Sequence, residues 1–215
     1  MQWHLLNEKL HYTSYHKKHI EWCKLGVYDL VYNLVIKLCK FNGKELKNLF
    51  IDSSMIKNIK GTDAIGKNHY DRFRSATKIN VVVNRQGIPL SLIFVKASVH
   101  DSTLTIKAIN KINVKIIGSR VIGDKGYINK QHKKLLKNKS IELIYPYRKN
   151  QLTNSKEEKT LLKKRYIVEH FFSWLKNYRK IRLRYDIKIS TFKGFVMLAC
   201  CDIVINKRKL SSLEL

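Results

Sequence analysis

Acidic residues are scarce in this sequence. Sixteen Asp and Glu stand against 43 Lys and Arg, which gives a formal net charge of +27 at pH 7. Such an excess of positive charge destabilises a compact fold by self-repulsion unless an anionic partner lies near, so nucleic acid is the expected partner. The alternative is the codon bias of an A·T-rich genome, which favours Lys, Asn and Ile. That bias raises the lysine count but does not explain why acids are few.

Signals for disulfides, secretion and membrane insertion are also missing. The four cysteines have neither CxxC nor Cys/His metal spacing, so they are expected to be buried thiols in a reducing compartment. The first residues, MQWHLLNEKLHY, contain no apolar segment of a secretory signal. The most apolar late stretch, Phe195 to Ile205, is interrupted by Asp202 and is too short to span a bilayer. The 215 residues suffice for one hydrophobic core.

Three acids stand at or beside apolar segments. The runs LFID and RVIGD end at Asp52 and Asp124, and the stretch from Lys164 to Tyr185 has an apolar stripe at helical period with Glu169 at its edge. Two parallel neighbouring strands that end in Asp place both carboxylates at the carboxyl edge of a sheet. A helix packed over that edge would add Glu169. Three carboxylates are hard oxygen ligands that suit Mg²⁺ or Mn²⁺.

The helix from Lys164 to Tyr185 also has a simpler interpretation. Arg165 and Glu169 are four residues apart, so they can form an ordinary surface ion pair. Lys176 lies on the same side two turns later, which leaves one acid between two cations. The two acid-terminated strands elsewhere in the chain favour the metal-site interpretation.

The rest of the sequence predicts an α/β order of elements. Residues 1–45 are expected to be helical, 58–75 a surface loop with Asp63 and Asp71 solvated, and 151–159 a linker. The first three strands should form a meander, and a helical crossover should make the fourth strand parallel to the first. Strands are expected at 49–52, 79–84, 90–96, 121–124 and 141–146, and helices at 102–112, 128–138, 164–185 and 192–206.

Two basic segments are candidates for contact with nucleic acid. Loop 58–75 carries Lys67, Arg72 and Arg74, which are placed to grip phosphates. In YPYRKN, tyrosines alternate with Arg148 and Lys149, a pattern that suits a nucleic-acid strand but is also common in plain loops.

Two further groups of residues adjoin the expected acid site. His100 and Asp101 follow a strand, and they are expected to belong to a turn in which Asp or Ser caps the next helix. The other interpretation places them in the site. Tyr127 is expected to pack beneath the acids.

Four motifs in this order resemble those of DDE transposases, in the large group of bacterial insertion-sequence enzymes related to IS5 and IS4. Arg165, Glu169 and Lys176 match three positions of that group's Tyr-Arg-Glu-Lys signature, and Leu162 stands where the Tyr is expected. The motifs are IDSS at 51–54, GIPLSLIFVKASVHDS at 87–102, GDKGY at 123–127 and RYIVEHFFSWLK at 165–176.

The resemblance implies an RNase H-like mixed α/β sheet flanked by helices over residues 46–208. A partial helical DNA-binding segment would precede it at 1–45, with its first half missing, and a tail would follow at 209–215. It also implies DNA strand cleavage at an element's ends and strand transfer into target DNA, with Mg²⁺ or Mn²⁺ held by Asp52, Asp124 and Glu169. Lys176 would hold a phosphate, and Arg165 would orient Glu169 or touch DNA.

The expected partner is DNA, bound by a homodimer. The expected location is the cytoplasm of a prokaryote, or the nucleus if the host is eukaryotic or viral, and not outside the cell. Two other functions stay open: a DNA endonuclease of the same fold without transposition, and an inactive DNA-binding remnant.

Overall fold

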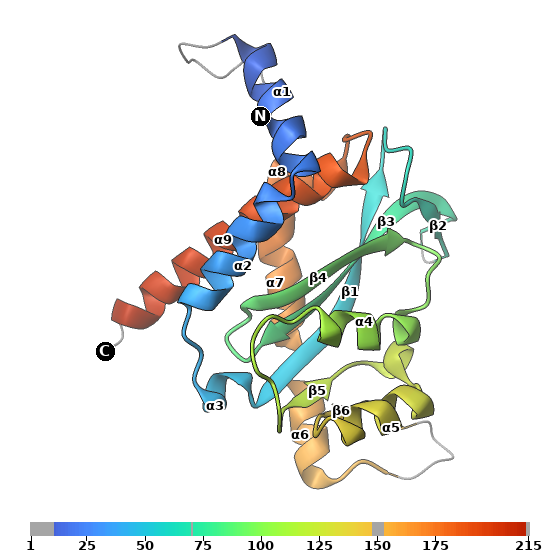
Figure 1. Ribbon diagram of the computed structural model, residues 1–215. Helices are drawn as coiled ribbons and strands as arrows, with labels where there is room; N and C mark the ends of the chain where they lie inside the picture. Colours follow the sequence, from blue (N-terminus) through green and yellow to red (C-terminus); the bar gives the residue numbers. More distant parts are fainter. Residues whose placement is uncertain (1–10, 70, 148–152, 214–215) are drawn as a thin grey trace.

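The computed structural model describes residues 11–69, 71–147 and 153–213. Within them one mixed sheet is flanked by helices (Figure 1). Its strand order is β2-β3-β1-β5-β6, with β4 also paired to β3 and β7 also paired to β1. The strands are β1 (Asn48–Asn58), β2 (Gly66–Asn68), β3 (Arg74–Asn84), β4 (Pro89–Lys96), β5 (Arg120–Ile122), β6 (Glu142–Ile144) and β7 (Leu183–Arg184).

Strand β1 is the centre of the sheet. It pairs antiparallel with β3 over nine residue positions, parallel with β5 at its start, and parallel with β7 at its end. Strands β3 and β4 continue the antiparallel meander, and β6 extends the parallel side beyond β5. The expected meander and the parallel fourth strand are therefore confirmed.

Helices cover both faces of the sheet. Because side chains alternate along a strand, Phe50 and Ile56 of β1 join one core cluster with residues of α2, α6, α7 and α9, whereas Leu49 and Ile51 join a second cluster with residues of α4 and α5. The helices are α1 (Tyr12–Lys24), α2 (Val27–Leu38), α3 (Gly43–Leu46), α4 (Thr105–Asn110), α5 (Lys130–Asn138), α6 (Lys156–Lys163), α7 (Tyr166–Asn177), α8 (Arg179–Arg182) and α9 (Ile189–Leu213), with 3₁₀ turns η2 (Asp101–Thr103) and η3 (Lys125–Tyr127).

Several expected boundaries are wrong. Strand β1 does not stop at Asp52 but continues to Asn58, because the polar residues that follow still pair with β3. The loop 58–75 contains β2, and the linker 151–159 already contains the start of α6, where a capping box at Ser155 begins the helix. The helix expected over 164–185 ends at Asn177 and is followed by α8 and β7.

Helix α9 is longer than the sequence pattern indicated. It runs from Ile189 to Leu213, so the expectation that this region is too short to cross a bilayer is wrong on length. Half of its most apolar window lies buried inside the protein, where α9 packs against α1, α2 and α7. Figure 1 shows α2 and α9 lying along each other. A helix that forms part of a protein core can have this length and composition.

Helix α2 presents a different face to the core than its leucines suggest. Leu30, Leu34 and Leu38 recur at helical spacing but are exposed. Tyr28 and Tyr32 are buried instead, and the Tyr32 hydroxyl donates to the Pro89 carbonyl at 2.8 Å. The spacing predicted the helix correctly, but it did not identify the buried side.

A buried arginine joins the end of the sheet to the start of α9. Arg184 is 0% exposed and donates to the Asp63 carboxylate at 2.6 Å and to the Thr77 hydroxyl at 2.7 Å. The same Asp63 carboxylate accepts the backbone N–H of Ile189, the first residue of α9. Asp63 is therefore not the solvated loop acid expected from the sequence. It is the anchor for a cation that would otherwise be buried unpaired.

Replacing Arg184 by Met should lower the free energy of unfolding by about 3–5 kcal/mol, because Asp63 and several carbonyls lose their donor. Urea unfolding followed by circular dichroism measures the change. The matched control is Arg182→Met, an exposed arginine of α8, which should stay within about 0.5 kcal/mol of the parent protein. Equal losses in both variants would contradict a specific role for Arg184.

Candidate active site

The pairing of β1 with β5 brings Asp52 and Asp124 to the same level of the sheet. Phe50 of β1 lies opposite Ile122 of β5. Asp52 follows Phe50 by two residues, and Asp124 follows Ile122 by two residues. Asp52 therefore shares the side of the strand that Phe50 presents to α7. Asp124 caps η3, and its Oδ1 accepts the backbone N–H of Gly126 at 2.8 Å. Two carboxylates predicted from the sequence thus lie together.

The carboxyl group of Asp52 has an unusually high pKa. Its pKa is raised from 3.8 to about 6, chiefly by burial and to a smaller extent by the negative charge of Asp124. The Ser53 backbone N–H, which donates at 2.8 Å, and the Arg165 guanidinium act in the opposite direction and lower the pKa. A buried carboxyl next to another carboxylate favours its neutral form unless a cation is near.

Arg165 is the cation beside Asp52. Its Nη2 lies 3.1 Å from Asp52 Oδ2, and both side chains are about one-fifth exposed. Arg165 is the N-cap residue of α7, whose apolar side packs on β1 and β3. The simpler interpretation, an ion pair between Arg165 and Glu169, is therefore wrong. Tertiary packing directs the arginine toward the sheet.

Glu169 does not join the two aspartates. It is exposed on α7, one helical turn after Arg165. Among the described residues no three His, Cys, Asp or Glu side chains are arranged so that they hold a metal ion. The structure thus brings together two of the three predicted ligands, and the third, Glu169, follows Arg165, the residue that contacts Asp52.

A hydrogen-bonded group supports the acids from the opposite face of the sheet. Tyr127 is fully buried, and its hydroxyl lies 3.1 Å from Ser53 Oγ and 2.7 Å from Asn80 Nδ2. Burial, the largest cause, raises the pKa of Tyr127 well above 10, so the phenol stays protonated. A Cβ on Gly123 would lie 2.9 Å from the Tyr127 ring, which explains the glycine there. Tyr127 was expected beneath the acids, whereas Asn80 gave no signal in the sequence.

A second buried ion pair lies beside this group. Lys78 Nζ donates to Asp101 Oδ1 at 2.8 Å and to the Val99 carbonyl. The Lys78 side chain is almost fully buried, and Asp101 lies near Gly126 in the turn after Asp124. The N-cap of η2 is His100, not Asp101 or Ser102 as expected. The turn interpretation is right in outline, but the acid binds a lysine that sequence reasoning did not identify.

The basic residues predicted to touch DNA lie in several places. Lys67, Arg72 and Arg74 are exposed around the connection of β2 to β3. Lys176 is half-buried near the end of α7, where burial lowers its pKa below 10.5. Arg148 and Lys149 lie outside the described residues.

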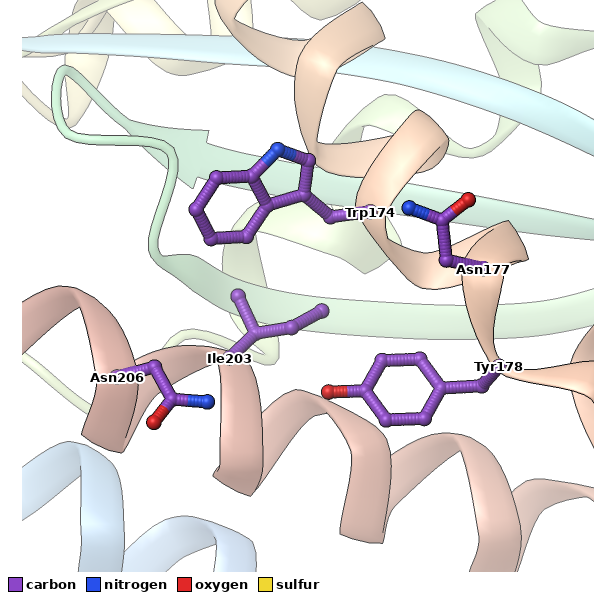
Figure 2. A pocket seen from close by; sticks show the side chains of 5 residues that line it. All are labelled: Trp174, Asn177, Tyr178, Ile203 and Asn206. Carbon is purple, nitrogen blue, oxygen red and sulfur yellow. The ribbon is translucent and has the colours of Figure 1, made fainter.

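A hollow of about 330 Å³ lies between the end of α7 and α9. Figure 2 shows the side chains around it. Neither Asp52 nor Asp124 lines this hollow, so it is separate from the paired acids. The lining residues are Trp174, Asn177, Tyr178, Ile203 and Asn206.

The sheet order, with Asp52 in β1 and Asp124 just after the parallel strand β5, defines an RNase H-like α/β protein. The sequence profile described as "Transposase DDE domain" matches residues 44–201. The chain belongs to this family of insertion-sequence transposases, whose general activity is metal-dependent cleavage and transfer of DNA strands. The resemblance seen in the motifs is thereby confirmed.

Individual relatives agree with this assignment. The chain is 30% identical over 155 residues to the protein assigned as the transposase of insertion sequence element IS402 of Burkholderia cepacia, covering 68% of this chain and 71% of that protein. A second match is 49% identical over 43 residues to the protein assigned as the transposase of IS6501 of Brucella ovis, covering 20% of this chain and 33% of that protein.

A solved structure shows the same fold. The piggyBac transposase, in a synaptic complex with hairpin DNA, superposes with a TM-score of 0.52 and 8% identity. The match covers 78% of this chain, which spans about half, 48%, of the piggyBac chain. At this identity the likeness concerns the fold alone.

The raised pKa of Asp52 predicts how stability depends on pH. Between pH 3.8 and about 6 the folded state binds more protons than the unfolded state, so the free energy of unfolding falls as pH rises through this range. Asp52→Asn should therefore stabilise the protein in EDTA at pH 7.5, by about 1–3 kcal/mol. Below pH 4 the difference should vanish.

Urea unfolding at the two pH values measures this difference. Asp71→Asn, which changes an exposed aspartate, is the matched control and should show little effect at either pH. A loss of stability in Asp52→Asn at pH 7.5 would mean that the ion pair with Arg165 outweighs the burial of the carboxylate.

Proposed function

We propose that this chain cleaves DNA at the ends of its own insertion sequence and joins the freed 3′-hydroxyls to target DNA. The observation that carries the proposal is the placement of Asp52 close to Asp124, where burial first, and the charge of Asp124 second, raise the pKa of Asp52. A largely buried carboxylate next to a second acid is costly to keep ionised without a cation, and such arrangements cluster at functional sites. Family membership supports the reaction class.

A divalent cation, Mg²⁺ or Mn²⁺, fits the side chains at this position. Asp52 and Asp124 offer hard oxygen donors, and a bound cation would remove the repulsion between them. When bound, the metal supplies Lewis-acid stabilisation of phosphate charge and lowers the pKa of an attacking hydroxyl. We propose Glu169 as the third ligand because it is exposed one turn from Arg165, which already contacts Asp52.

The chain's other groups would orient these acids and bind the DNA. Arg165 fixes the position of Asp52 through their ion pair. Lys176, with its pKa lowered by burial, would hold a phosphate near the cut. The further phosphate contacts that we propose are Lys67, Arg72, Arg74, Arg148 and Lys149.

DNA is the proposed partner, as element ends and as target, and the net charge of +27 supports it. Since two ends must be brought together, we propose a homodimer on DNA. The relatives are bacterial insertion-sequence proteins, so the proposed place of action is the bacterial cytoplasm.

Leu162 does not argue for an inactive remnant. Its side chain is partly buried and packs against the hydrophobic core. A leucine in place of the family's tyrosine thus fills a packing position in α6. Activity is therefore expected despite this departure from the signature.

The experiment is cleavage of a supercoiled plasmid that carries the gene's own locus with its flanking DNA, in Mg²⁺ or Mn²⁺. Cuts are expected at the locus boundaries. Asp52→Asn, Asp124→Asn and Glu169→Gln should each reduce the rate at least about a hundredfold, because each removes a proposed metal ligand. The control is Glu142→Gln, an exposed acid of β6.

Each outcome has a distinct meaning. Scattered cuts that depend on the same three acids would favour a plain endonuclease. Full activity in any one variant would remove that residue from the site. Binding of DNA without any metal-dependent product would contradict the proposed activity.

A further inference from the structure

The turn between β2 and β3 holds two residues in a rare backbone conformation. Arg72 has φ of 47° and Phe73 has φ of 57°, both in the left-handed region. The Arg74 backbone N–H donates to the Asp71 carbonyl at 2.9 Å, which closes a two-residue turn. Gly and Asn are the usual residues at such positions, because a larger side chain is strained there. Arginine and phenylalanine are therefore unusual residues at these two positions.

The phenyl ring of Phe73 lies largely in solvent. The residue is 58% exposed, although a ring of this size normally gains free energy by burial. The His69 ring meets the Phe73 ring edge-on, with 5.1 Å between the two centroids. The turn thus holds a large aromatic ring at the protein surface. Both the strained backbone and the exposure of the apolar ring to water are unfavourable. Strained backbone of this kind clusters at binding sites.

Exposed cations lie near Phe73 along the chain and across the strand pair. Arg72 and Arg74 flank it in the sequence, and Lys67 of β2 stands opposite Ser75. Asp71 lies 3.8 Å from Arg74 in a pair that is about half exposed, so it neutralises little of this charge. An exposed aromatic ring among cations matches a surface that contacts bases and phosphates together.

The turn lies at a fixed distance from the paired acids. Strand β3 runs from the turn to Val81, which stands opposite Asp52 in the register. Eight residues separate Phe73 from Val81, about 25 Å along an extended strand. This length corresponds to about seven base pairs of duplex at about 3.4 Å each. Strand β2 is the edge strand at the other side of the sheet from β6, so the turn stands at the rim of the sheet (Figure 1).

We propose that Phe73 inserts between base pairs of the DNA duplex whose backbone lies at Asp52 and Asp124, while Arg72 and Arg74 hold the adjacent phosphates. This inference rests on the proposed function only in requiring that DNA occupies the site. Insertion of an apolar side chain unstacks a base step and kinks the duplex, which lets a bent DNA reach both the turn and the acids.

The test compares binding of two 30-base-pair duplexes from a locus boundary in EDTA, one fully paired and one with a single-base bulge. A bulge is already unstacked, so a protein that inserts a side chain binds it more tightly. The full chain should prefer the bulged duplex at least about fivefold. Phe73→Ala should lose that preference, and Phe73→Leu, which keeps an apolar wedge, should retain part of it.

Charge variants separate the wedge from phosphate binding. Arg72→Gln and Arg74→Gln should each weaken binding to both duplexes by the same factor. Each should also reduce the steepness of log affinity against log salt by about one, and the preference for the bulged duplex should remain. Ile117→Ala, which removes an exposed apolar side chain from the loop before β5, should change neither quantity.

The Phe73→Gly variant tests whether a loss of preference for the bulged duplex could come from misfolding. Glycine accepts the left-handed conformation, so the thermal midpoint of this variant should equal or exceed that of the parent while the preference disappears. A parent protein that binds both duplexes equally, or a Phe73→Ala variant that keeps the preference, would overturn the inference and leave the proposed cleavage standing. No binding to either duplex would overturn the inference and count against the proposed function as well.

Discussion

The burial of Asp52 beside Asp124 is the constraint on which the structure of the site depends. Burial raises the pKa of Asp52, and the negative charge of Asp124, just beyond the parallel strand β5, adds to the rise. The sheet keeps them close because β1 pairs in parallel with β5, with Phe50 opposite Ile122, and a one-residue shift of register would turn apolar residues outward. Arg165 then supplies the positive charge. Rigid pairing and one cation together hold a site that like charges alone would disperse.

Helix α7 makes this arrangement possible. Its buried side chains, among them Val168 and Phe171, fix the helix against β1 and β3. That packing points Arg165 at Asp52 and leaves Glu169 exposed one turn away. The apolar stripe therefore contributes to function as well as stability, because a shift of the helix would remove the cation from the acid. The same helix ends at Asn177, where the chain turns into α8 and β7.

The sequence contained enough information to predict the order of strands and the nearness of two acids. Alternating apolar runs with tight turns indicate a meander, and a helical crossover makes the next strand parallel, so Asp52 and Asp124 had to meet. It did not show which acid Arg165 binds, because Glu169, four residues later on the same helix, is an equally good partner by spacing. It also missed Asn80 and Lys78, because a buried polar residue is recognised only by what it contacts across the sheet. The exposed leucines of α2 show the same limit: spacing reveals a helix, but tertiary packing selects its buried side.

The excess of positive charge has more than one use in this fold. Arg184 is wholly buried and serves Asp63 and the start of α9, and Lys78 is buried against Asp101. These cations stabilise the protein and are unable to reach a ligand. The cations of the β2–β3 turn, by contrast, are exposed and have little acid beside them. Composition alone counts both kinds equally, so the net charge indicates a polyanionic partner but not where it binds. Burial makes that distinction, and it leaves the strained turn at Arg72 and Phe73 as a surface whose charge is available to DNA.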